Sequence, residues 1–211
     1  MNTTDNFVLA IESAIAGGSI SLQKNGIEID NWLGSSNVSK AEDLLVNIHE
    51  ILTSNNISRR DISLIAASAG PGSFTGIRIG LATSLGLKAG LSVTMSSASA
   101  LKAIASAFDG LGMCVVAVPV GRNSVCVQRF NIDVTSCLPL DEPHTFTDSD
   151  FSQFVKSETA TNMVLHSALF ERFESSPNIT DFGVNIAYAI GQLCTKSPGV
   201  TIAPLFISKS F

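Results

Sequence analysis

Charged residues are scarce in this chain: Asp, Glu, Lys and Arg make up 15% of its 211 residues, against about 25% in an average protein. Apolar residues make up 45%, which excludes an intrinsically disordered chain because disorder requires few apolar residues and many charges. The net charge is −5, and the longest basic run is Arg59-Arg60, so strong direct binding of nucleic acid is not expected. So little charged surface predicts apolar surface that a partner covers.

Paired cysteines and long apolar runs are also lacking. The four cysteines, Cys114, Cys126, Cys137 and Cys194, form no C-x-x-C pair, and we expect reduced thiols of a cytoplasmic protein. The apolar run closest to a membrane span covers residues 111–120 and contains Gly112 and Pro119, far short of the ~20 residues that a bilayer requires. The polar first five residues lack the basic region of a signal peptide. We therefore expect no membrane segment.

Hydrophobic periodicity divides the chain into two similar halves. In the first half it predicts strands at 7–11, 19–22, 27–33, 62–67 and 91–95, and helices at 41–52, from the glycine-rich segment to 89, and at 98–108. In the second half it predicts strands at 114–120, 125–130, 132–140, 163–166 and 201–207, and helices at 148–156 and 182–194. Ser39 and Glu42 fit a capping box at the start of the first helix. The order predicts a two-lobed α/β protein with lobes 1–109 and 110–211.

The densest motif is the glycine-rich segment at residues 70–80, GPGSFTGIRIG. It differs from the dinucleotide-binding fingerprint because Thr75 occupies the last glycine position and no Asp or Glu lies between Asp61 and Asp109. It differs from a P-loop because Ile77, not lysine, follows Gly76. The segment also lacks the G-x-S-x-G form of a nucleophile elbow around Ser73, so Ser73 or Thr75 is expected to cap the following helix.

Small residues continue along the predicted helix after this segment. Gly76, Gly80, Thr83 and Gly90 fall near one face, with Ala82, Gly86 and Ala89 beside it. Each interior glycine costs a helix about 1 kcal/mol relative to alanine, and close packing is the usual compensation. The sequence leaves two alternatives open: packing inside the chain, or an interface with another protein.

Residues 66–91, AASAGPGSFTGIRIGLATSLGLKAGL, closely resemble the signature of the TsaB (YeaZ) family. The resemblance extends over residues 7–108 and includes 8–13, 41–52 and 96–101. It implies an actin-like (ASKHA) fold of two RNase-H-like lobes, the second one reduced here. It also implies a role in tRNA modification: TsaB is the small partner of TsaD, which carries the metal site, the ATP site and the chemistry that makes threonylcarbamoyladenosine in tRNA.

From this resemblance we expect a protein-binding subunit without catalytic residues or a metal of its own. The expected partner interface comprises Gly72, Ser73, Phe74, Thr75, Gly76, Arg78, Ile79, Gly80 and Thr83. The helix that carries them would bind TsaD or, through the same face, a second copy of this chain, and TsaE is a further expected partner. ATP or ADP would be shared at the interface with TsaD, and Arg78 would meet a carboxylate or a phosphate there. Gly80→Arg is expected to block docking and leave the fold largely intact.

The chain departs from the family pattern at several polar positions. Glu12-Ser13-Ala14 replaces Asp-Thr-Ser on the first strand, and Lys40 replaces a histidine. In the second half, Pro119-Val120-Gly121-Arg122 and Phe206-Ile207-Ser208 replace polar segments. Glu12 and Ser13 are therefore expected to be at most a vestigial nucleotide site. These changes indicate a divergent member.

Three other functions remain alternatives. A stand-alone actin-fold ATPase or transferase would use Glu12 as its carboxylate, but the following residues Ala14, Ile15 and Ala16 are apolar and suit phosphate poorly. A glycoprotease-like hydrolase would require paired metal ligands, whereas His49, His144 and His166 are far apart in sequence and are each expected to be ordinary surface or boundary residues. A self-associating structural protein is the third alternative.

Overall fold

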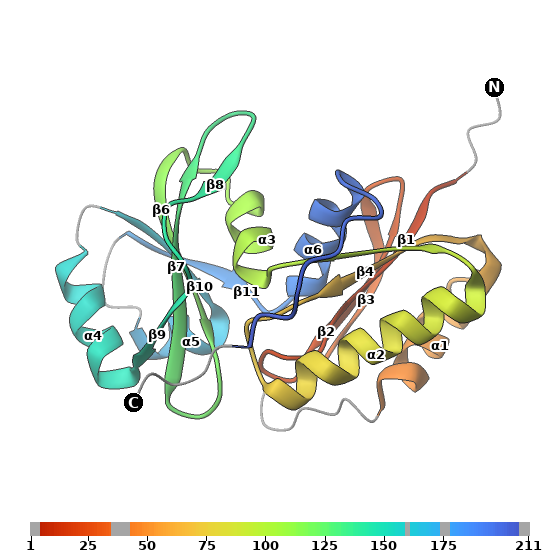
Figure 1. The fold of residues 1–211 in the computed structure, drawn as a ribbon, viewed down its shortest axis with the longest axis horizontal. Coiled ribbons are helices and arrows are strands. Elements are labelled where there is room, and N and C mark those ends of the chain that lie inside the picture. The colour runs from red at the N-terminus through yellow and green to blue at the C-terminus, as the bar shows by residue number, and fades with distance from the viewer. Residues whose placement is uncertain (1–4, 35–42, 159–160, 174–177, 207–211) are drawn as a thin grey trace.

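A computed structural model describes residues 5–34, 43–158, 161–173 and 178–206. It shows two mixed β-sheets side by side, with helices between them and on their outer faces (Figure 1). The first sheet has the order β3-β2-β1-β4-β5. Its strands are β1 (Phe7–Glu12), β2 (Ser19–Lys24), β3 (Ile27–Leu33), β4 (Ile62–Ser68) and β5 (Thr94–Ala98). The first three strands form an antiparallel meander, and β4 and β5 extend the sheet in parallel from β1.

The second sheet repeats this topology. Its main path is β8-β7-β6-β10-β11, and β9 pairs with β7. Its strands are β6 (Gly112–Pro119), β7 (Ser124–Ile132), β8 (Cys137–Pro139), β9 (His144–Thr147), β10 (Asn162–His166) and β11 (Ile179–Gly183). Again an antiparallel meander is followed by two parallel strands. The shared topology of the two sheets confirms the predicted two-lobed α/β class.

The helices differ more between the lobes than the strands do. In the first half of the chain the helices are α1 (Leu44–Ser54), before β4, α2 (Phe74–Leu91), between β4 and β5, and α3 (Ala100–Ala107), after β5. In the second half α4 (Asp148–Ser157), α5 (Ser167–Phe173) and α6 (Ile186–Thr195) occupy the same places relative to β10 and β11. With 10 and 7 residues, α4 and α5 are shorter than α1 and α2, which have 11 and 18. The reduction of the second lobe thus lies in its helices.

The last helix of each half of the chain packs against the sheet of the other half. α3 contacts β6 and β7 of the second sheet, whereas α6 contacts β1, β2 and β4 of the first. The two helices also contact each other between the sheets (Figure 1). One continuous apolar cluster therefore includes residues of both sheets, such as Ala10 and Val116, together with Ile104 and Ile190 from these helices. The division at residues 109 and 110 separates the strands, but α6 and residues 197–206 return to the first sheet.

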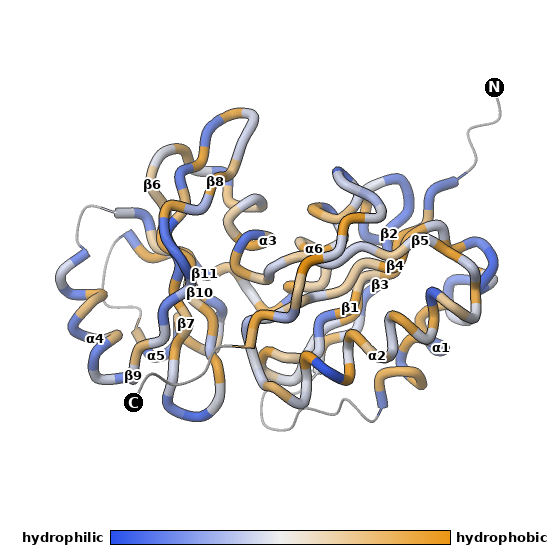
Figure 2. The backbone as a smooth tube through the Cα atoms, viewed as in Figure 1, coloured by the Kyte–Doolittle hydropathy of each residue, from blue (hydrophilic) through white to orange (hydrophobic). Residues whose placement is uncertain are grey.

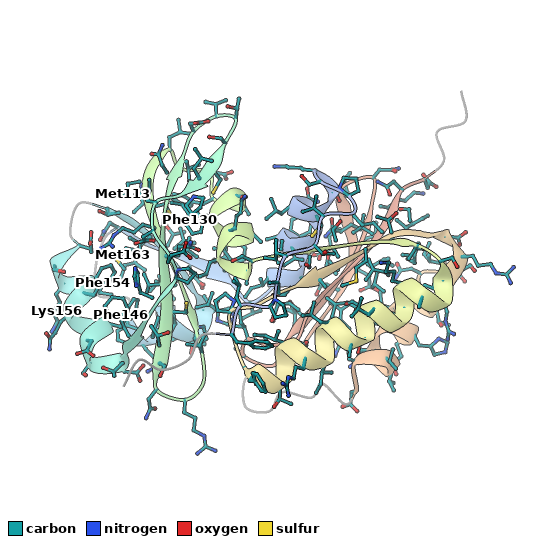
Figure 3. The ribbon with its side chains drawn as sticks, in the orientation of Figure 1. Met113, Phe130, Phe146, Phe154, Lys156 and Met163 are labelled. Carbon is teal, nitrogen blue, oxygen red and sulfur yellow. The ribbon has the colours of Figure 1, made fainter. Side chains whose placement is uncertain are left out.

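Outer helices cover the opposite faces of the two sheets. α1 packs on the first sheet over Leu9 and Ile20, and Figure 2 shows hydrophobic residues concentrated along β1 and β4 at its centre. On the second sheet, Phe151 of α4 is fully buried. Phe146 and Phe154 lie beside it, with their ring centroids 5.1 Å apart (Figure 3).

Most predicted elements occur within a few residues of their expected bounds. β9, α5 and β11 were not predicted. The predicted helix 182–194 begins too early, because Phe182 and Gly183 belong to β11 and α6 starts at Ile186. Residues 201–206 form no strand. The predicted capping box at Ser39 and Glu42 and the substituted Lys40 lie outside the described residues. Within the described part, no helix is long and apolar enough to cross a bilayer.

Candidate functional site

The glycine-rich segment forms a tight connection between β4 and α2. Gly70 adopts a positive φ of 96°, a conformation that favours glycine over other residues. Ser73 is the N-cap of α2, and its hydroxyl accepts a hydrogen bond from the Gly76 N–H at 3.4 Å, as the sequence predicts. The Ser73 N–H in turn donates to the Ala14 carbonyl at 2.8 Å. The segment thus joins the start of α2 to the turn after β1.

Gly76 and Gly80 pack inside the chain against that same turn. A Cβ atom on Gly76 would lie 2.3 Å from the Ser13 carbonyl oxygen, and one on Gly80 would lie 2.3 Å from the Ser13 Oγ. Gly72 approaches Ala14 in the same way, since its Cβ would lie 2.6 Å from that of Ala14. The Ser13 hydroxyl donates to the Gly76 carbonyl at 2.8 Å. Of the two alternatives, packing inside the chain is therefore correct for these three glycines.

This placement changes the expected effect of one substitution. The prediction that Gly80→Arg leaves the fold largely intact is wrong, because a side chain at position 80 would meet Ser13. Of the other expected interface residues, Phe74, Thr75 and Arg78 are exposed, while Ser73, Ile79 and Thr83 are half-buried. The exposed residues lie at the first turns of α2.

The glycines in the second half of α2 have a different environment. Gly86 and Gly90 are exposed, and a Cβ atom on either would have no neighbour within 4 Å. Both line an open groove of about 360 Å³ between α1 and α2, over β1 and β4 of the first sheet. Its other lining residues are Leu9, Leu45, Ile48, His49, Leu52, Arg59, Ile62, Leu87 and Leu91. We call this the α1/α2 groove.

Large apolar side chains are exposed on α1 and α2, the helices that form the α1/α2 groove. Leu45, which lines the groove, and its neighbour Val46 are 59% and 55% exposed, and Leu85 of α2 is 53% exposed. Exposed apolar side chains on the helices of an apolar groove are typical of a protein-binding surface. Because Gly86 and Gly90 add no side chain there, the backbone of another helix can approach α2 closely. The small-residue pattern of the sequence includes Gly86 and Gly90, but the predicted partner interface contained Gly76 and Gly80 instead.

Glu12 is buried at the end of β1 and caps the turn that follows it. Its Oε1 accepts hydrogen bonds from the backbone N–H groups of Ala14 at 2.6 Å and Ile15 at 3.1 Å. Burial raises the pKa of Glu12 to about 8, although these two bonds act in the opposite direction. Successive backbone N–H groups at a turn can bind a phosphate, but here the Glu12 carboxyl occupies those of Ala14 and Ile15.

The three histidines do not come together in a metal site. Within the described residues, no group of three His, Cys, Asp or Glu side chains could hold an ion. His49 and His144 are exposed, as expected. His166 was not expected to be buried, but it is only 2% exposed, and burial lowers its pKa to about 4. Its Nδ1 accepts a hydrogen bond from the Ala168 N–H, so it is a neutral core residue.

Comparisons with known proteins agree with the resemblance seen in the sequence. Residues 37–136 match the family model described as TsaD: tRNA N6-adenosine threonylcarbamoyltransferase. The tRNA threonylcarbamoyladenosine biosynthesis protein TsaB of Buchnera aphidicola is 52% identical over 50 residues, which are 24% of this chain and 23% of that protein. TsaB of Escherichia coli is 33% identical over 98 residues, 46% of this chain and 42% of that protein. Each match thus covers less than half of the relative's length.

Solved structures resemble the fold over nearly the whole chain. A protein described as similar to peptidase YEAZ from Pseudomonas aeruginosa has a TM-score of 0.68 at 14% identity, covering 94% of this chain and 99% of that one. YeaZ from Pseudomonas aeruginosa has a TM-score of 0.65 at 15% identity, covering 90% and 92%. The shared fold therefore includes the second lobe, where the sequence resemblance is weak.

Proposed function

Because the chain belongs to the TsaB (YeaZ) family, we propose that it is a protein-binding subunit in the synthesis of threonylcarbamoyladenosine in tRNA. Its partner is TsaD, which carries out threonylcarbamoyl transfer, and the α1/α2 groove is the surface that docks on it. A second copy of this chain competes for the same surface. TsaE joins the complex, and ATP or ADP is held at the interface rather than by this chain alone.

The observation that carries this proposal is the exposed α1/α2 groove. Leu45, Val46 and Leu85 each leave more than half of their surface in water, and burying apolar surface is worth about 25 cal/mol per Å². Gly86 and Gly90 have no side chains, so the surface of α2 at these positions lies close to its backbone. A partner helix that lies there gains both apolar contact and a close approach.

The turn after β1 disfavours the stand-alone ATPase. The N–H groups of Ala14 and Ile15 already donate to Glu12, so a phosphate would have to displace a buried carboxyl. Gly72 and Gly76 bring α2 directly against the same turn. A glycoprotease-like activity is disfavoured because the described residues contain no metal-ligand cluster. The remaining alternative is a chain that binds only a second copy of itself, and a binding experiment with TsaD distinguishes the two.

Gly86→Arg is the variant that tests the docking surface. A Cβ atom on Gly86 would have no neighbour within 4 Å outside its own stretch of helix, and the residue is exposed in the groove, so we expect an arginine there to leave the fold intact. Gln153→Arg is the matched control, because it adds the same charge to an exposed helical position on α4. The wild-type chain and the control are expected to co-elute with TsaD from the same organism, and Gly86→Arg is not. Equal co-elution of all three would exclude this surface.

A further inference from the structure

The last described residues form a segment that covers an edge of the first sheet. Residues 197–206, which we call the C-terminal segment, follow α6 and run past β5 toward the start of α2 (Figure 1, dark blue). The Ser97 N–H donates to the Val200 carbonyl, and the Ile202 N–H donates to the Ser97 Oγ, each at 2.9 Å. The Leu205 N–H donates to the Ala69 carbonyl at 2.8 Å. The segment is therefore fixed along its length, and its end is held beside the glycine-rich segment.

This course places an aromatic ring on the first residue of α2. The rings of Phe206 and Phe74 have centroids 4.7 Å apart. One helical turn later, the guanidinium carbon of Arg78 lies 3.8 Å from the centroid of the Phe74 ring. Phe206 and Phe74 remain 45% and 50% exposed. The three side chains form one surface cluster, in which Phe74 connects the C-terminal segment to Arg78.

The cluster holds a cation that has no charged partner in the described part of the chain. The ion pairs found there do not include Arg78. A guanidinium is attracted to the face of an aromatic ring. A free arginine side chain loses rotamer freedom when it binds a partner. Stacking on Phe74 removes part of that freedom in advance, so Arg78 is prepared to bind an anionic group.

Arg78 shares a face of α2 with Leu85, which directly precedes the groove residue Gly86. Arg78, Leu85 and Ala89 are spaced i, i+7 and i+11, which aligns them on a helix of 3.6 residues per turn, and all three are exposed. A partner that covers Leu85 and extends toward the start of α2 therefore reaches Arg78. Lys88 is the other basic residue of α2 and lies at its opposite end. α2 thus offers a single guanidinium at this end, and a single guanidinium can pair with one carboxylate through two parallel hydrogen bonds.

We propose that the C-terminal segment belongs to the docking surface: through Phe206 and Phe74 it positions Arg78 to pair with a carboxylate of the partner enzyme. This inference rests on the proposed function. Phe206 and Phe74 are positioning residues, and Arg78 makes the contact. The proposal adds a charged contact to a surface that is otherwise apolar, so it contributes to the choice of partner.

The test measures the affinity for TsaD of wild type, Phe206→Ala, Arg78→Ala and the double variant at two salt concentrations. Arg78→Ala is expected to weaken binding about tenfold and to reduce its salt dependence. Phe206→Ala is expected to weaken binding about threefold, and to have no further effect in the Arg78→Ala background, because it acts through Arg78. Phe206→Tyr keeps the ring and restores affinity. Ile202→Ala is the control on the same segment outside the cluster and leaves affinity unchanged.

The outcomes separate this inference from the proposed function. If wild type does not bind TsaD, the proposed function fails and the inference fails with it. If wild type binds and Phe206→Ala binds equally well, or if its effect adds fully to that of Arg78→Ala, only the inference is wrong. An effect of Arg78→Ala that appears only with added ATP would identify a phosphate as the ligand and overturn the carboxylate.

Discussion

The Ser13 hydroxyl donates a hydrogen bond to the Gly76 carbonyl at 2.8 Å, although 63 positions separate the two residues. It ties the turn after β1 to the first turns of α2, where Gly76 and Gly80 leave no room for a side chain. The first half of α2 is thus held against the turn after β1. In the other half, a Cβ atom on Gly86 or Gly90 would have no neighbour within 4 Å, which is why we propose that a partner docks there.

Gly80→Ala is expected to destabilise the chain by about 1–3 kcal/mol, the usual cost of excess volume in a packed site. Its Cβ would lie 2.3 Å from the Ser13 Oγ. Gly86→Ala is the matched control and is expected to stabilise by about 0.5–1 kcal/mol, because alanine is the better helix former. Urea unfolding of the two variants measures whether the free energy of unfolding falls in Gly80→Ala and rises in Gly86→Ala. If Ser13→Ala fails to offset Gly80→Ala, the contact with Ser13 is not the cause.

Glu12 is expected to lower stability as the pH rises from about 4.5 to about 8. Its pKa is raised in the folded chain, so the folded state binds more protons than the unfolded state across this range, and that stabilising contribution is lost toward alkaline pH. Each pKa unit corresponds to about 1.4 kcal/mol. Glu12→Gln is expected to flatten this part of the profile of unfolding free energy against pH. An unchanged slope would show that Glu12 ionises normally.

His166 is expected to lower stability in acid. Its pKa is lowered from 6.5 to about 4, so the unfolded state takes up a proton first and stability falls as the pH decreases through this range. In His166→Asn the Asn Oδ1 can replace Nδ1 as acceptor for the Ala168 N–H. This variant is expected to remove the part of the acid slope between about pH 6.5 and 4. A slope identical to that of the wild type would contradict this account.

The two lobes are expected to unfold together, because α3 and α6 join both sheets in one apolar cluster. Phe151 is fully buried in the second lobe, and Phe151→Ala is expected to cost about 3–5 kcal/mol. The single tryptophan, Trp32, lies on β3 of the first sheet. In Phe151→Ala, the unfolding midpoint measured by Trp32 fluorescence should shift by the same amount as the midpoint measured by far-ultraviolet circular dichroism. A Trp32 transition that stays at the wild-type position would show independent lobes.

The sequence predicts the order of elements well because each strand of the first lobe has its own periodicity and turn signals. It does not predict β9, α5 and β11 because these elements are short: they have 4, 7 and 5 residues. The packing of α6 on the first sheet cannot be predicted from its own sequence, because an apolar helix face does not determine which sheet it covers.

The candidate site shows the same limit. Periodicity groups Gly76, Gly80 and Gly90 on one face of α2, but it does not show that the turn after β1 covers only the first two. The capping of the Ala14 and Ile15 N–H groups by Glu12 depends on its burial, which an apolar neighbourhood alone does not establish. The contact of Phe206 with Phe74 joins residues more than a hundred positions apart and cannot be predicted from spacing.

The most direct test of the central claim is the affinity of the chain for TsaD from the same organism, measured by calorimetry with and without ATP. The account predicts a one-to-one complex for wild type and for Gln153→Arg, and loss of binding by at least about 100-fold for Gly86→Arg, as expected when a bulky charge enters the centre of an interface. Equal affinity of Gly86→Arg and Gln153→Arg, or no complex with wild type, would contradict it.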